Sequence, residues 1–66
     1  MDDPIKALEA IVIVAHDRGH SVEVVYLPQA KHAQWLVSVR KSSGLLADMG
    51  LGRDLAEAVA MLARRY

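Results

Sequence analysis

The residues of this chain whose chemistry could support catalysis or metal binding gather in one short run. His16 and His20 stand four positions apart, the spacing at which two imidazoles on one helical face can share a metal ion. Asp17 and Arg18 lie between them, so the run also contains charged groups of the kind that transfer protons. Gly19 interrupts the run, and no third metal ligand, nucleophile or oxyanion-binding group accompanies it. We therefore expect no metal site, no cofactor and no catalytic site, and we predict that the chain is not an enzyme.

What this run can do depends on the structure of the four β-branched residues before it, Ile11 to Val14. A buried strand here would belong to a parallel α/β unit, whose crossover connections need more chain than 66 residues provide. Asp3 followed by Pro4 is instead typical of a helix start. Asp caps the helix, and Pro lacks the backbone N–H that would be left unpaired in the first turn. We predict a helix over Pro4–Arg18, ended by Gly19, with the β-branched run on its inner face and a strand as the alternative. The predicted apolar stripe consists of Ile5, Leu8, Val12 and Ala15, widened by Ile11.

The middle of the chain predicts three strands. Val22–Leu27 is β-branched and aromatic and stops at a proline. Trp35–Lys41 alternates between two faces, one with Trp35, Val37 and Val39 and the other with Leu36, Ser38 and Arg40. Leu45–Met49 follows a turn and forms the third strand. Trp35 and Met61 are expected in the core, because they offer large apolar side chains.

The end of the chain predicts a second helix. Gly50-Leu51-Gly52 is interpreted as a flexible turn, and a capping box from Asp54 to Glu57 then starts a helix over about residues 53–66. The predicted fold is α+β: an αβββα chain in which two helices pack on one face of a three-stranded antiparallel meander. We expect a single compact domain over residues 1–66.

Composition and charge disfavour several classes of protein. Lys plus Arg and Asp plus Glu number eight each, so the formal net charge is zero, which disfavours a surface built to neutralise nucleic-acid phosphates. Hydrophobic residues make up 53% of the chain, which argues against disorder, and no cysteine is present for a disulfide or a zinc site. No stretch approaches the ~20 apolar residues of a membrane span, and the N-terminus has no basic leader, so we expect a cytoplasmic protein with no membrane association.

The alternation within the strands predicts one sheet face for the helices and a second face that stays uncovered. The residues expected to face the helices are Val22, Val24, Tyr26, Trp35, Val37 and Val39. The other face then carries an apolar cluster rimmed by charges, which is typical of a protein-binding surface. The residues predicted to bind a partner there are Glu23, Val25, Leu27, Leu36, Arg40 and Asp48.

Features along nearly the whole chain resemble the double-stranded RNA-binding domain. They are Pro4 to Leu8 near the first helix start, Gly19 after it, His32 ahead of the aromatic Trp35, and the glycines that precede an alanine-rich last helix. The resemblance implies an αβββα fold and, as an alternative function, nucleic-acid binding. The family's phosphate-binding lysines would fall on Leu55, Ala56 and Val59. The resemblance therefore implies a degenerate relative that lacks the basic phosphate-binding cluster. The residues predicted for nucleic-acid binding are Lys31, His32, Arg40, Lys41 and Arg53.

Our first hypothesis for the function is a small, non-enzymatic protein-binding module whose partner is another protein or a second copy of the chain. Cysteine-free single domains of this length are common among phage and mobile-element accessory proteins. By analogy of size and architecture, we expect an inhibitor of a host defence complex, similar to anti-CRISPR proteins. The alternatives are the nucleic-acid-binding module and a small enzyme or metal protein centred on His16 and His20.

Overall fold

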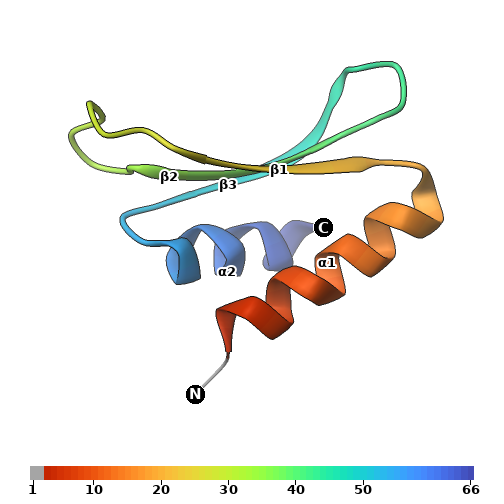
Figure 1. Cartoon of the computed structure of the whole chain (residues 1–66), viewed down its shortest axis with the longest axis horizontal. Helices are drawn as coiled ribbons and strands as arrows, with labels where there is room; N and C mark the ends of the chain where they lie inside the picture. The colour runs from red at the N-terminus through yellow and green to blue at the C-terminus, as the bar shows by residue number, and fades with distance from the viewer. Residues whose placement is uncertain (1–2) are drawn as a thin grey trace.

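The computed structural model describes residues 3–66 and contains two helices and a three-stranded sheet (Figure 1). The elements follow in the order α1 (Pro4–Arg18), β1 (Ser21–Tyr26), β2 (Trp35–Arg40), β3 (Leu46–Gly52) and α2 (Leu55–Arg65). The strands pair antiparallel in the order β1-β2-β3, and Figure 1 shows both helices on the same side of the sheet. The predicted α+β fold and its αβββα order are confirmed.

Helix α1 begins at a side-chain cap and ends at a left-handed glycine. The Asp3 Oδ1 atom accepts a hydrogen bond of 2.9 Å from the Ile5 amide, and Pro4 occupies the first turn. Gly19 has a φ of 71°, and its amide donates to carbonyl oxygens of the last turn. The helix has the predicted bounds, so the strand alternative for the β-branched run is wrong.

The β-branched run of α1 does not form the inner face that we predicted. Only Ile11 is buried, whereas Val12, Ile13 and Val14 are exposed. A helix turns by about 100° per residue, so four consecutive side chains point around its circumference and cannot all face the sheet. The residues of α1 that reach the core or pack against it are Ala7, Leu8, Ile11 and Ala15.

Strand β3 is longer than its sequence predicted, because it continues through Gly50, Leu51 and Gly52 instead of turning there. An added Cβ on Gly50 would lie 2.1 Å from the Ala58 carbonyl oxygen, and one on Gly52 would lie 2.4 Å from the Ala58 amide nitrogen. No side chain fits at such distances. Both positions are therefore glycine because α2 crosses β3 at backbone contact.

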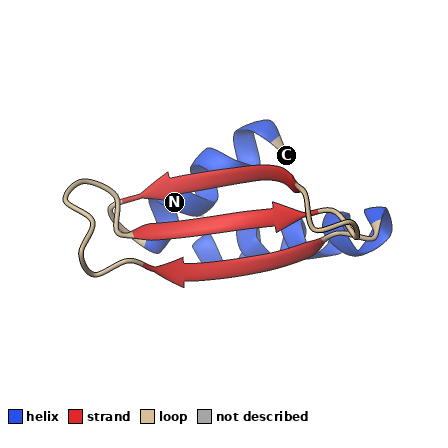
Figure 2. Ribbon diagram, turned by 90° about the horizontal axis from the view of Figure 1, so that it is seen from above, coloured by secondary structure: helices blue, strands red, loops and turns tan. Residues whose placement is uncertain are grey.

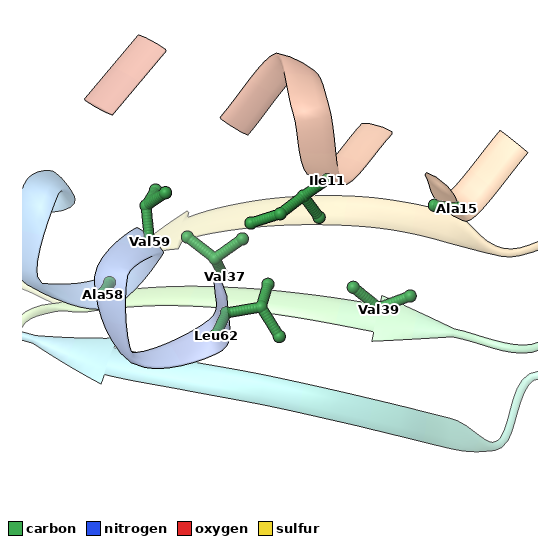
Figure 3. Close-up of a cluster of buried hydrophobic side chains, with 7 residues drawn as sticks. All are labelled: Ile11, Ala15, Val37, Val39, Ala58, Val59 and Leu62. Carbon is green, nitrogen blue, oxygen red and sulfur yellow. The ribbon is translucent and has the colours of Figure 1, made fainter. Parts of the chain in front are cut away.

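The hydrophobic core lies between the central strand and the two helices (Figure 3). Its buried members are Ile11, Ala15, Val37, Val39, Ala58, Val59 and Leu62. Trp35 packs against this core and is partly buried, whereas Met61, which we expected inside, is exposed.

Strand β1 contributes no buried residue to the core. Val24 pairs with Val37 and therefore points to the helix side, as predicted, but it remains 42% exposed. Tyr26 pairs with Trp35 and is 55% exposed. The helices thus cover β2 and β3 well and leave much of β1 accessible.

Helix α2 starts at the predicted Asp54 cap, but Glu57 reaches the amide of Arg53, one residue before the cap, and not that of Asp54 as a capping box requires. The Asp54 Oδ1 atom accepts from the Glu57 amide at 2.8 Å, and the Glu57 carboxylate accepts from the Arg53 amide at 3.2 Å. Within residues 3–66, neither helix has the length and apolar run needed to cross a membrane.

The last residue of the chain joins the end of α2 to the start of β1. The Tyr66 hydroxyl lies 2.7 Å from the Nδ1 atom of His20. The Arg18 guanidinium stacks over the Tyr66 ring at 4.8 Å from its centroid. These contacts hold the C-terminus beside the α1–β1 connection.

Candidate functional site

No element within residues 3–66 covers the sheet face opposite the helices (Figure 1). This face carries an apolar cluster. Val25, Leu36 and Leu51 form one row across the three strands, because each is the register partner of the next. Met49 lies two residues before Leu51 on the same face. We call these four partly buried residues, Val25, Leu36, Met49 and Leu51, the open-face patch.

Ser38 stands at the centre of this face with its hydroxyl unsatisfied. It lies between Glu23 of β1 and Met49 of β3 in the register, and it is only 2% exposed. Its Oγ atom has no hydrogen-bond partner among residues 3–66. A buried hydroxyl without a partner costs about 1–3 kcal/mol. The open-face patch therefore adjoins a buried hydroxyl that has no hydrogen-bond partner among residues 3–66.

Two opposite charges border the patch. Glu23 and Arg40 are both exposed and lie on the same face as Ser38, one on β1 and one on β2. The Arg40 Nη1 atom donates to the Gly44 carbonyl at 3.1 Å, so the β2–β3 turn orients the guanidinium. Leu27 lies just past the end of β1, on the same face as Val25. Its amide donates to the Gln34 carbonyl at 2.6 Å, which continues the hydrogen-bond ladder between β1 and β2. The structure thus brings five of the six predicted partner-binding residues onto one face.

Asp48 is the exception, because a β-bulge turns it to the helix side. Arg40 pairs with Leu46 while Val39 pairs with Asp48, so Ala47 is the extra residue in β3. One extra residue exchanges the two faces of a strand. The Asp48 Oδ1 atom lies 2.7 Å from the Arg65 Nη2 atom of α2. Its expected place on the uncovered face is therefore wrong.

Met49 and Leu51 belong to the same face and were not among the predicted site residues. They alternate with Gly50 and Gly52, which face α2. That alternation was visible in the sequence, but the interpretation of the glycines as a turn ended the strand too early. A longer third strand would have given Leu51 as the partner of Leu36.

The basic residues predicted for nucleic-acid binding lie at both ends of the sheet. Lys31 and His32 are exposed in the loop that leads into β2, and Arg53 follows β3 at this same end. Arg40 and Lys41 lie at the opposite end of β2. The Arg53 guanidinium also lies 3.8 Å from the Glu57 carboxylate, which offsets its charge. The structure thus brings together three of these five residues and separates the other two from them.

The two histidines of the opening run have different surroundings. His20 contacts Tyr66, whereas His16 is exposed in the last turn of α1. Within residues 3–66, no three His, Cys, Asp or Glu side chains gather in a way that could hold a metal ion.

A second concave surface lies between the helices, on the far side from the open-face patch. It is a groove of about 710 Å³, lined in part by Ala7, Ala56, Ala60 and Ala63. Lys6 and Arg64 also border it. The small side chains leave space between α1 and α2, and the groove offers mainly aliphatic contact.

Comparison with known proteins gives one likeness over most of the chain. A segment of the thymidylate kinase of Prochlorococcus marinus is 37% identical over 54 residues, which cover 82% of this chain and 24% of the kinase. The chain therefore spans about a quarter of the length of the curated relative that it matches. No protein family model matches the chain, and no solved structure matches it.

The likeness contradicts our prediction that the chain is not an enzyme, because the protein that shares the segment is a kinase. That prediction rested on the lack of a complete catalytic set within 66 residues. The match covers only part of a longer enzyme, so its catalytic groups need not lie within the shared segment. A missing set in a short chain is thus no evidence against a relationship to an enzyme.

Proposed function

We propose that this chain is a protein-binding module that contacts its partner through the open-face patch. The observation that carries the proposal is the uncovered apolar row Val25, Leu36 and Leu51, which contributes one side chain from each strand. Aliphatic side chains provide burial on association, while Glu23 and Arg40 at the border provide charge complementarity.

The test compares two substitutions of equal charge at different surfaces. Leu36→Glu places a carboxylate at the centre of the open-face patch, whereas Ile13→Glu changes a side chain of α1 that is 64% exposed. Both variants and the wild-type chain are used as bait in bacterial lysate, and bound proteins are identified by mass spectrometry. We expect the wild type and Ile13→Glu to retain the same proteins and Leu36→Glu to lose them. Retention by Leu36→Glu with an unchanged circular dichroism spectrum would contradict the proposal.

The specific form of the proposal is a cytoplasmic accessory protein of a phage or mobile element that blocks a host defence complex, as anti-CRISPR proteins do. Its support is an analogy of size and architecture. A direct test adds the purified chain to a defence nuclease reaction. Inhibition that is lost with Leu36→Glu and kept with Ile13→Glu supports this form, and undiminished cleavage at saturating chain contradicts it.

Nucleic-acid binding is a second candidate, favoured by the αβββα order and by the position of Lys31, His32 and Arg53 at one end of the sheet. The module would then be a degenerate relative of the double-stranded RNA-binding domain. Duplex RNA and DNA binding measured over a salt series tests it, because phosphate contacts weaken as salt rises. The candidate fails when affinity is absent at low salt or does not change with salt.

The likeness to thymidylate kinase favours a third candidate, a domain that takes part in phosphoryl transfer to thymidylate. Such an enzyme must hold two phosphate-bearing reactants in line. Calorimetric titration of the chain with thymidine monophosphate and with ATP tests this candidate. Heat of binding for either nucleotide supports it, and the lack of binding at millimolar nucleotide contradicts it for the isolated chain.

A further inference from the structure

The outer edge of β1 has backbone groups that the sheet leaves unpaired. The Leu27 amide donates to the Gln34 carbonyl, so these two residues form a hydrogen-bonded pair. Hydrogen-bonded pairs alternate along an antiparallel ladder, which places the amides and carbonyls of Val22, Val24 and Tyr26 on the outer side. β1 is an edge strand, so these groups have no partner strand among residues 3–66. An edge of this kind is a template for another strand.

The other edge of the sheet is occupied by side chains of α2. The Leu51 amide donates to the Met61 sulfur at 3.4 Å, and the Arg65 guanidinium donates to the Met49 carbonyl. Both contacts use the backbone groups of β3 that point away from β2. Figure 2 shows the end of α2 reaching past the β3 side of the sheet, whereas no helix formed by residues 3–66 flanks the outer side of β1. The protein therefore protects one edge and leaves the other accessible.

Exposed apolar side chains border the accessible edge. Val24 and Tyr26 are 42% and 55% exposed on the helix side of β1. Ile5 and Val12 are exposed on α1, on the flank turned away from the residues that contact α2. Because α1 lies under β1 while α2 lies under β2 and β3, this flank borders the same edge. We call these four residues the β1-edge patch.

We propose that a second copy of this chain pairs with the β1 edge, antiparallel and about a two-fold axis at Val24. Val24 then pairs with the second copy's Val24, and Val22 pairs with the second copy's Tyr26. In this register the outward amides and carbonyls of each β1 strand meet those of the other. The two sheets join into one continuous sheet, and the β1-edge patches of the two copies face each other. A two-fold contact of this kind needs a self-complementary surface.

The charges of β1 fit a second copy. In this register Glu23 lies opposite the second copy's Val25. The two Glu23 carboxylates are therefore not cross-strand partners, and the destabilising pairing of like charges is avoided. The formal net charge of zero also leaves no overall repulsion between two copies. Aromatic and β-branched residues, here Tyr26 opposite Val22, are favourable cross-strand partners.

The experiment measures mass in solution by light scattering after size exclusion. At about 100 µM, above the dissociation constant of a micromolar dimer, the wild-type chain is expected at twice its monomer mass of 7.2 kDa. Val24→Lys and Val24→Glu each place like charges opposite one another, and each removes apolar burial twice per dimer. We expect either variant to weaken the dimer on the order of 100-fold. A mixture of the two variants restores the dimer, because opposite charges then meet at the axis.

Leu46→Lys is the matched control, because Leu46 is 45% exposed and lies on the protected edge strand β3. This variant is expected to remain dimeric. A monomeric wild type, or a dimer that survives Val24→Lys, would overturn the proposal. A mixture of Val24→Lys and Val24→Glu that stays monomeric would also overturn the proposal. The same holds for a wild-type chain that does not pair with itself but pairs with an unrelated strand-forming peptide. A monomeric wild-type mass overturns the proposal even when a charged variant fails to fold.

Discussion

Replacing Gly50 by alanine is expected to force α2 away from β3. The added methyl group would lie 2.1 Å from the Ala58 carbonyl oxygen and 2.8 Å from the Leu62 amide nitrogen. Ordinary contact begins at 3.4 Å, so the helix must retreat by about 1.3 Å, the difference between 3.4 Å and 2.1 Å. Backbone atoms cannot rotate out of the way as a flexible side chain can. The retreat also loosens Leu62, which is fully buried in the core.

The expected loss of stability is large for a domain of this size. Overpacking costs up to about 3 kcal/mol, whereas 66 residues are stabilised by only about 3–10 kcal/mol in total. At about 4–8 °C per kcal/mol, a cost of about 3 kcal/mol lowers the melting temperature by about 12–24 °C, which is the upper limit expected for Gly50→Ala. Circular dichroism during heating, together with urea unfolding, measures the change.

Gly44→Ala is the control for this experiment. Gly44 has a φ of 92° but no atom within 4 Å of an added Cβ, so its cost is conformational, about 1 kcal/mol. Gly50→Ala should therefore destabilise the protein clearly more than Gly44→Ala. A melting temperature of Gly50→Ala within about 4 °C of the wild type, or above that of Gly44→Ala, would refute the backbone contact between α2 and β3.

Three further substitutions test contacts of the described residues. Ser38→Ala removes a buried hydroxyl that has no partner and should stabilise the isolated chain by up to about 2 kcal/mol; a lower melting temperature would show that the hydroxyl is paired. Tyr66→Phe removes the contact with His20 and should cost about 1 kcal/mol, seen in urea unfolding, whereas no change would mean that the contact is not formed in solution. Asp48→Asn weakens the ion pair with Arg65 and should cost at most about 1 kcal/mol, with a smaller cost at high salt; a cost that does not change with salt would argue against the ion pair.

The ends of α1 could be predicted because their signals are local. The cap at Asp3, the proline after it and the left-handed Gly19 each act within a few residues of the helix end. The length of β3 could not be predicted in this way. Gly50 and Gly52 are typical of a turn, and only the position of α2 reveals that close packing requires them.

The uncovered face shows the same limit. Alternation placed Val25, Leu36 and Arg40 correctly, because a strand alternates along its own length. Asp48 was misplaced because the bulge at Ala47 depends on how β3 pairs with β2. The exposure of Val24 and Tyr26 depends on where α1 crosses the sheet, which residue spacing does not specify.

The contacts that α2 makes with the outer side of β3 also limit how many copies of the chain can join the sheet. A chain with two accessible strand edges could add copies at both sides and extend into a filament. Here Met61 and Arg65 occupy one edge, so strand pairing at β1 ends after a single addition. Replacing Met61 and Arg65 by alanine would remove both contacts, and such a variant could then extend at either edge.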